Sequence, residues 1–201
     1  YKPDVVNTEY ENIDFNDYTT NDGSLPSGFD KVKADDVMNV APTGGRSGGA
    51  NDFALGFTAE ASERNTHRAM YRFDSPIGEN IEFDINLDMY VSNATGYVYL
   101  ADESDFTQDN RGNYLNNSLI SVNKDGLLMY ASGRSSSPDK ILDNSLTLTS
   151  GQWHNINIKV LPDSDDNKNY LVISVDGGTA YKVETSRSFD QKAVYGIGVG
   201  Y

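Results

Sequence analysis

Apolar and polar residues alternate along much of this chain. The clearest run is residues 81–89, Ile-Glu-Phe-Asp-Ile-Asn-Leu-Asp-Met, in which every second side chain is apolar. A period of two is typical of a strand with one buried and one solvent-facing side. Residues 66–73 alternate in the same way, and the turn-forming segment 74–80 separates the two runs. The pattern predicts an antiparallel hairpin in which Arg68 and Arg72 face the acidic row of the second strand.

Further short strands are expected along the rest of the chain, at residues 96–101, 119–123, 127–131, 153–160, 170–176, 180–184 and 194–199. Residues 123–126 (Asn-Lys-Asp-Gly) and 176–178 (Asp-Gly-Gly) are typical of tight hairpin turns. No window of 11 or more residues keeps helical spacing. Many short strands joined by glycine-rich turns predict an all-β fold, an antiparallel β-sandwich of the jelly-roll type.

Length and charge narrow the possible functions. A chain of 201 residues suits one domain, which we expect at residues 11–201, preceded by a linker tail at residues 1–10. The chain has no cysteine, which excludes a disulfide framework, a thiol nucleophile and thiolate metal sites. The formal net charge of −14 disfavours nucleic acid and anionic membranes as partners. No run of about 18 apolar residues is present, so no membrane-spanning segment is expected.

Two segments resemble the concanavalin-like and laminin-G-like jelly rolls. Residues 151–160 (GQWHNINIKV) match the strand that opens with Gly-x-Trp-His, and residues 170–177 (YLVISVDG) match the hairpin strand that ends in Asp-Gly. Residues 12–17 (NIDFND) with 25–29 (LPSGF), and residues 195–199 (YGIGV), resemble the entry and exit strands of carbohydrate-binding modules. The resemblance spans the chain and implies a secreted, bacterial module that is covalently linked to a catalytic domain acting on plant cell-wall polysaccharide.

Catalysis is not expected from these residues. With two histidines, His67 and His154, we expect structural roles: His67 shares a strand face with apolar residues, and His154 follows a tryptophan at a strand start. Residues 82–86 resemble the Glu-x-Asp-x-Glu strand of retaining glycosidases, which need two carboxylates about 5 Å apart. Here Asn86 occupies the position of the acid and cannot protonate a leaving group. The row is therefore interpreted as the solvent-facing side of a strand.

Acidic clusters in three loops are candidate calcium sites. Asp14, Asn16 and Asp17 lie near the entry strand, where the resemblance implies one structural Ca²⁺. Asp163, Asp165 and Asn167 are an alternative, because their oxygens recur at alternating positions as in calcium loops. Residues 102–110 form a third cluster. A solvated loop without metal is the competing interpretation of each.

The ligand-binding hypothesis rests on aromatic and planar polar side chains. Tyr97 and Tyr99 flank Val98, so both project to the face opposite Val98 and would form an exposed platform if Val98 is core. We expect four further ligand-contacting residues nearby, Tyr130, Arg134, Asn123 and Arg72. The alternative is that the tyrosines pack within the sandwich. Net charge favours a neutral glucan, xylan or mannan, whereas the arginines leave a uronate polymer such as pectin open.

Three functions remain. The first is a non-catalytic carbohydrate-binding module that concentrates a linked, secreted enzyme on its polysaccharide. The second is a glycoside hydrolase or polysaccharide lyase that uses Glu82 and Asp84. The third is an adhesive or structural module that binds a protein.

Overall fold

The computed structural model describes residues 13, 15, 28–32, 38–41, 45–47, 54–57, 68–78, 80–90, 95–103, 106, 118–132, 139–162, 168–185 and 194–200. The described residues form thirteen labelled strands: β1 (Phe29–Val32), β2 (Met38–Ala41), β3 (Ala54–Phe57), β4 (Arg68–Ile77), β5 (Phe83–Tyr90), β6 (Gly96–Ala101), β7 (Ser118–Val122), β8 (Leu128–Tyr130), β9 (Lys140–Ile141), β10 (Trp153–Leu161), β11 (Asn169–Val175), β12 (Tyr181–Thr185) and β13 (Val194–Gly200). In this part of the chain, no helix has the length and apolar character that a bilayer span requires.

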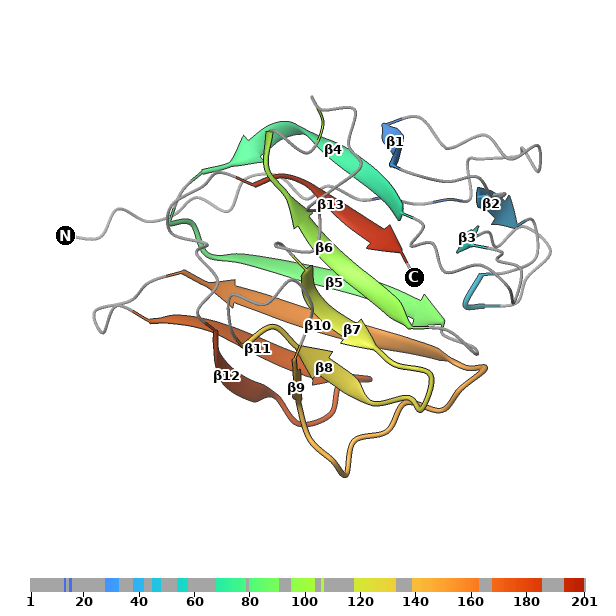
Figure 1. Ribbon diagram of the computed structural model, residues 1–201, viewed down its shortest axis with the longest axis vertical. Coiled ribbons are helices and arrows are strands. Elements are labelled where there is room, and N and C mark those ends of the chain that lie inside the picture. Colours follow the sequence, from blue (N-terminus) through green and yellow to red (C-terminus); the bar gives the residue numbers. More distant parts are fainter. Residues whose placement is uncertain are drawn as a thin grey trace.

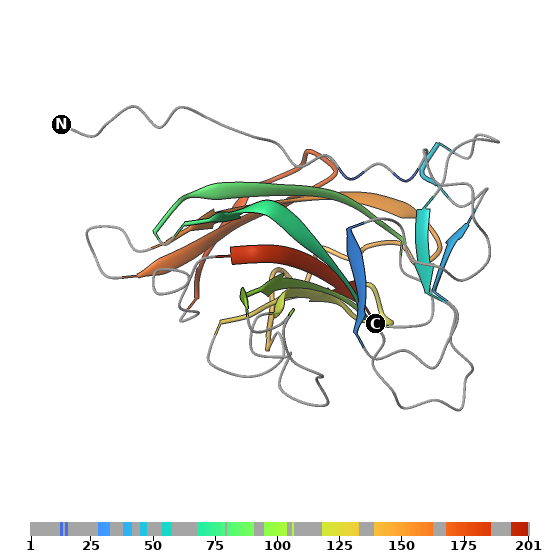
Figure 2. The same cartoon turned by 90° about the horizontal axis from the view of Figure 1, so that it is seen from above.

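Two antiparallel sheets lie face to face, as the two views in Figures 1 and 2 show. The larger sheet has seven strands in the order β1-β4-β13-β6-β7-β8-β9, and the smaller has four in the order β12-β11-β10-β5. Strands β2 and β3 pair separately at one end of the sandwich. This arrangement is the antiparallel β-sandwich that the alternating pattern predicts.

The core lies between the inner faces of the two sheets. The smaller sheet contributes every second residue of β10 and β11, including Ile156, Ile158 and Ile173, each fully buried. The larger sheet contributes Val98 from β6 and Ile120 from β7, also fully buried. Alternation along these strands places the remaining side chains on the outer faces of the two sheets.

The expected strands and turns are present, and their bounds agree to within a few residues. Strand β6 is Gly96–Ala101 as expected, and β10 extends one residue beyond the expected range. The turn at residues 123–126 is closed by a 2.9 Å hydrogen bond from the Gly126 N–H to the Asn123 carbonyl oxygen, with φ of 77° at Gly126. Asp176 and Gly177, with φ of 51° and 68°, form the second turn.

The expected hairpin between residues 66–73 and 81–89 is wrong. Strand β4 pairs with β1 and β13 in the larger sheet, whereas β5 pairs with β10 in the smaller one. Apolar and polar residues alternate on both strands. The apolar sides pack against the shared core from opposite sheets, through Phe73 on β4 and Ile85 on β5. Arg72 therefore does not face the acidic row of β5.

Candidate functional site

The outer face of the smaller sheet combines aromatic and planar polar side chains. Strand β5 alternates half-buried and exposed residues from Phe83 to Tyr90. Its register with β10 places Tyr90 opposite Trp153, Asp88 opposite Asn155, and Asn86 opposite Asn157. Side chains of directly opposed residues lie on the same face of a sheet. The exposed row of β5 and the polar row of β10 therefore form one continuous surface.

Tyr90 and Trp153 form an aromatic pair at one end of this surface. Their ring centroids are 5.5 Å apart and the ring planes are inclined by 53°. Tyr90 is 48% exposed, while Trp153 is half-buried beside it. The tryptophan supports the tyrosine ring from the side and leaves much of that ring accessible to solvent.

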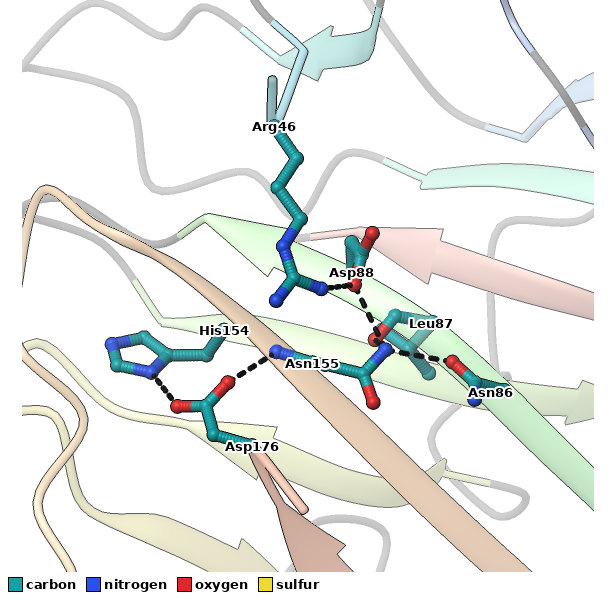
Figure 3. A network of polar contacts seen from close by, with 7 residues as sticks. All are labelled: Arg46, Asn86, Leu87, Asp88, His154, Asn155 and Asp176. Atoms are coloured by element: carbon teal, nitrogen blue, oxygen red, sulfur yellow. Dashed lines mark hydrogen bonds and ion pairs between the residues drawn. The ribbon is translucent and has the colours of Figure 1, made fainter. Parts of the chain in front are cut away.

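A polar network lies beside the aromatic pair and is drawn in Figure 3. The Asn155 Nδ2 group donates to Asn86 Oδ1 at 2.7 Å and to Asp88 Oδ1 at 2.8 Å. Arg46, from the turn at residues 45–47, reaches the same strand and forms an ion pair with Asp88. The amide and carboxylate groups are thus held in fixed orientations before any ligand arrives.

His154, near the start of β10, and Asp176, just after the end of β11, hold one end of the network. Asp176 Oδ2 lies 2.7 Å from His154 Nδ1, and Asp176 Oδ1 accepts the backbone N–H of Asn155 at 2.9 Å. The other ring nitrogen of His154 lies 3.3 Å from the Thr149 carbonyl oxygen. The hydrogen bond with His154, followed by that from Asn155, lowers the pKa of the Asp176 carboxyl. The structural role that the sequence predicts for His154, packing or hydrogen bonding, is confirmed as hydrogen bonding.

We call Tyr90, Trp153, Asp88, Asn155 and Arg46 the Tyr90 surface. It offers one accessible aromatic face, carboxylate and amide oxygens that accept hydrogen bonds, and a guanidinium that is already paired. Such a surface suits a ligand with a flat apolar side and hydroxyl groups at its edges. The groups are fixed on strands, which hold geometry better than loops do.

The residues that the sequence indicated as a platform lie on the other sheet. Tyr97 and Tyr99 project outward from β6, with ring centroids 5.9 Å apart, and Val98 between them is core, which was the condition for the platform. Tyr99, however, is only 1% exposed. It lies opposite Gly198 of β13, and the Met70 sulfur occupies the space that a side chain at Gly198 would fill. The exposed platform expected at these two tyrosines is therefore absent at Tyr99.

The other predicted ligand contacts are dispersed. Tyr130 lies opposite Ile120 in the sheet and belongs to the core, so it is on the other face from Tyr97. Its neighbour on β8, Met129, points outward. Arg72 is on the same outer face as Tyr99, with its guanidinium carbon 5.4 Å from the Phe106 ring centre. Arg134 lies outside the described residues.

The Asn123 side chain forms hydrogen bonds within its own turn. Its Oδ1 accepts the backbone N–H groups of Asp125 and Leu127, at 3.0 and 2.9 Å. Asparagine commonly stabilises turns through such local side-chain bonds. The Asn123 Oδ1 atom therefore stabilises the turn between β7 and β8.

The candidate calcium ligands fall outside the described residues: Asp14, Asn16, Asp17, Asp163, Asp165 and Asn167. Within the described part of the chain, no three His, Asp or Glu side chains are grouped so that they could hold a metal ion. A structural calcium therefore stays a prediction, which a comparison of melting temperatures with calcium and with EDTA would test. The expected linker tail at residues 1–10 also lies outside the described range.

The acidic row on β5 is solvent-facing, as expected. Asp84 and Asn86 are exposed, and Glu82, just before the strand, forms an ion pair with Lys159 of β10. The hydrogen bond to Glu82 raises the pKa of Lys159. Asn86, at the position where a glycosidase acid would stand, accepts the hydrogen bond from Asn155.

Sequence reasoning missed the Tyr90 surface although one signal for it was present. The alternation in residues 81–89 continues for one more step and places Tyr90 on the same face as Asp84, Asn86 and Asp88. The pairing with Trp153 and Asn155 had no such signal, because it depends on the register between two strands that are 63 or more positions apart in the chain. Arg46 comes from a glycine-rich loop whose position the sequence does not specify.

Comparisons with known proteins add likenesses of fold. No protein-family model matches the sequence, and no curated protein sequence matches it. Among solved structures, the chain is similar to the lectin UEA-II in complex with galactose (TM-score 0.47, 11% identity, 86% of this chain and 82% of that one). It is similar to the Lotus tetragonolobus seed lectin (0.45, 14%, 88% and 86%) and to the marine PL-14 alginate lyase from Aplysia kurodai (0.37, 10%, 67% and 79%). The β-sandwich assignment rests on this chain's own strand order and register.

Proposed function

We propose that this chain is a non-catalytic carbohydrate-binding module and that it binds polysaccharide through the Tyr90 surface. The observation that carries the proposal is the half-exposed ring of Tyr90 beside a hydrogen-bonded set of carboxylate and amide groups on one sheet face. A sugar ring has an apolar side that packs on an aromatic face, and hydroxyl groups at its rim that need acceptors and donors.

Preorganisation of the polar groups favours this use. Asn155 is fixed by its hydrogen bonds to Asn86 and Asp88, and its backbone N–H is held by Asp176. A ligand that binds groups already in place does not have to order them, so less of the interaction energy is lost on binding. Asp88 has two carboxylate oxygens, and the contacts to Arg46 and Asn155 both involve Oδ1.

Several features support binding without catalysis. Of the two carboxylates that the enzymatic alternative would use, Glu82 is already engaged in an ion pair with Lys159. The third position of the motif is an amide, Asn86, and it accepts a hydrogen bond within the network. Sugar release from a polysaccharide that disappeared in Glu82→Gln would overturn this part of the proposal.

The cellular setting is part of the same proposal. We infer a secreted bacterial protein in which a covalently linked catalytic domain is held close to plant cell-wall polysaccharide by this module. Tethering raises the effective concentration of the enzyme on the polymer and needs no new contact in the catalytic site. The full-length gene would test this setting, because a neighbouring catalytic domain supports it and a neighbouring set of adhesive repeats would contradict it.

Affinity electrophoresis in gels that contain glucan, xylan, mannan or pectin tests the binding site. We expect at least one polymer to retard the protein, and Tyr90→Ala to weaken that binding about tenfold or more, a loss of ~1.4 kcal/mol. Tyr97→Ala is the matched control, since Tyr97 projects from the outer face of the other sheet. Retardation lost in Tyr97→Ala but kept in Tyr90→Ala would transfer the site to the larger sheet. No retardation by any polymer would overturn the proposed function.

A further inference from the structure

The charges around the Tyr90 surface indicate which class of polysaccharide it takes. We infer that it selects neutral, hydroxyl-rich polymers over uronate polymers, and that Asp88 sets this selectivity by holding the Arg46 guanidinium. The inference rests on the proposed function and adds the ligand class and the residue that determines it.

Every basic side chain described on or beside the strands of the smaller sheet is engaged. Arg46 pairs with Asp88, and Lys159 pairs with Glu82. Lys168 contacts Glu184 at 2.8 Å, and the Lys182 ammonium lies 4.1 Å from the centre of the Tyr170 ring. Arg46, Lys159 and Lys168 are thus already paired with carboxylates of the protein, and Lys182 lies on β12, at the opposite edge of the sheet from Tyr90.

Uronate polymers need such a cation. Each sugar of the chain carries a carboxylate, which proteins bind most strongly with the paired N–H groups of arginine or with lysine. The carboxylates on this face would instead repel a uronate, because Asp84, Asp88 and Asp176 are all at least partly exposed. The chain as a whole carries a formal charge of −14, so its long-range field also repels a polyanion.

Asp88 is the residue that decides the local charge at Tyr90. The two residues are two positions apart on β5 and project to the same face, so they lie roughly 7 Å apart along the strand. The Arg46 and Asp88 side chains are 46% and 39% exposed, which leaves their ion pair within reach of a ligand seated on Tyr90. Removal of the Asp88 charge would release a guanidinium beside the aromatic ring, where an anionic sugar could bind it.

Two variants with the same charge change test this assignment. Asp88→Asn keeps the shape of the side chain and an oxygen that accepts from Asn155, but it no longer forms an ion pair with Arg46. Glu82→Gln also raises the net charge by one, and it removes the ion pair with Lys159. Glu82 is eight residues from Tyr90, roughly 25 Å along the strand direction. The pair therefore separates a local effect at Tyr90 from an effect of net charge.

The probes are polygalacturonate and a neutral xylan or glucan, in affinity gels at low ionic strength, where electrostatic effects are largest. We expect the wild-type protein to be retarded strongly by a neutral polymer and only weakly by polygalacturonate. The ratio of uronate to neutral affinity should rise about tenfold in Asp88→Asn and less than about twofold in Glu82→Gln. The rise should shrink when salt is added.

Four outcomes would overturn parts of the account, and they are distinguishable. Wild-type binding to polygalacturonate that is as strong as binding to neutral polymers, and that is lost in Tyr90→Ala, overturns the inference and leaves the proposed function standing. Equal rises in the two charge variants overturn the role of Asp88, as does an unchanged ratio in Asp88→Asn. If no polymer binds the wild-type protein, the proposed function fails and the inference fails with it.

Discussion

Tyr90 on the smaller sheet and Tyr99 on the larger sheet both project away from the core, yet 48% of Tyr90 is exposed and only 1% of Tyr99. Tyr90 stands at the end of an edge strand and contacts Trp153 on one side. Tyr99 lies in the middle of a seven-stranded sheet, beside Tyr97 and opposite Gly198, over which the Met70 side chain extends. The outer side of a sandwich strand is thus not always its solvent-accessible side.

The difference shows what makes an outer face available to a ligand. On the larger sheet, Ser118 and Ser121 of β7 and Ala101 of β6 are also almost fully buried, although they do not face the core between the sheets. On the smaller sheet, the outer residues of β5 are exposed from Asp84 to Tyr90. Accessible area, rather than the number of tyrosines, distinguishes the two faces as binding surfaces.

The largest expected effect is on stability and contrasts the two tyrosines. Tyr99→Ala removes a buried ring and should lower the free energy of unfolding by about 3–5 kcal/mol. Tyr90→Ala removes a half-exposed ring and its contact with Trp153, and should cost about 1 kcal/mol. Urea unfolding of both variants measures the two values. Equal losses would contradict the assignment of Tyr99 to packing and of Tyr90 to an accessible surface.

A smaller effect is expected from pH, through Asp176. Its hydrogen bonds with His154 and with the Asn155 N–H lower the pKa of Asp176 from the usual 3.8. The ionised group therefore stabilises the fold above that value, and this contribution is lost as the pH falls through the lowered pKa. The side chain is 46% exposed, so solvent screening keeps the contribution small.

Asp176→Asn is the variant that measures this contribution, because asparagine also tolerates the positive φ at this position. We expect a lower melting temperature than wild type at about pH 6, and a difference that narrows as the pH falls below 3.8. A difference that stayed constant down to about pH 2 would show that the loss does not come from the charge.

Much of the fold could be predicted because short-range patterns determine it. Alternation locates the strands, including β6 at residues 96–101 and β10 from residue 153, and it separates the two faces of each strand. The turns at Gly126 and Gly177 follow from the positive φ that glycine readily adopts. These features depend on a few neighbouring residues.

The pairing of strands, and the burial of side chains on an outer face, could not be predicted in the same way. Alternation states that Arg72 and Asp84 lie on outer faces, but it does not say that their strands belong to different sheets. It states that Tyr99 points away from Val98, but not that the Met70 side chain lies over Gly198 beside it. The candidate site depends on such distant pairings, since it joins Arg46, Asp88 and Asn155 from three separate segments.

The central claim is that polysaccharide binds at the Tyr90 surface, and Trp153 reports on it directly. Trp153 is the single tryptophan of the chain and contacts Tyr90, so intrinsic tryptophan fluorescence comes from this surface alone. Titration with a neutral oligosaccharide, chosen from the polymer that retards the protein, should change its intensity or emission maximum with saturation, and Tyr90→Ala should weaken the midpoint about tenfold. Tyr97→Ala should leave the titration unchanged. Binding seen by calorimetry with no change in Trp153 fluorescence would contradict the assignment of the site.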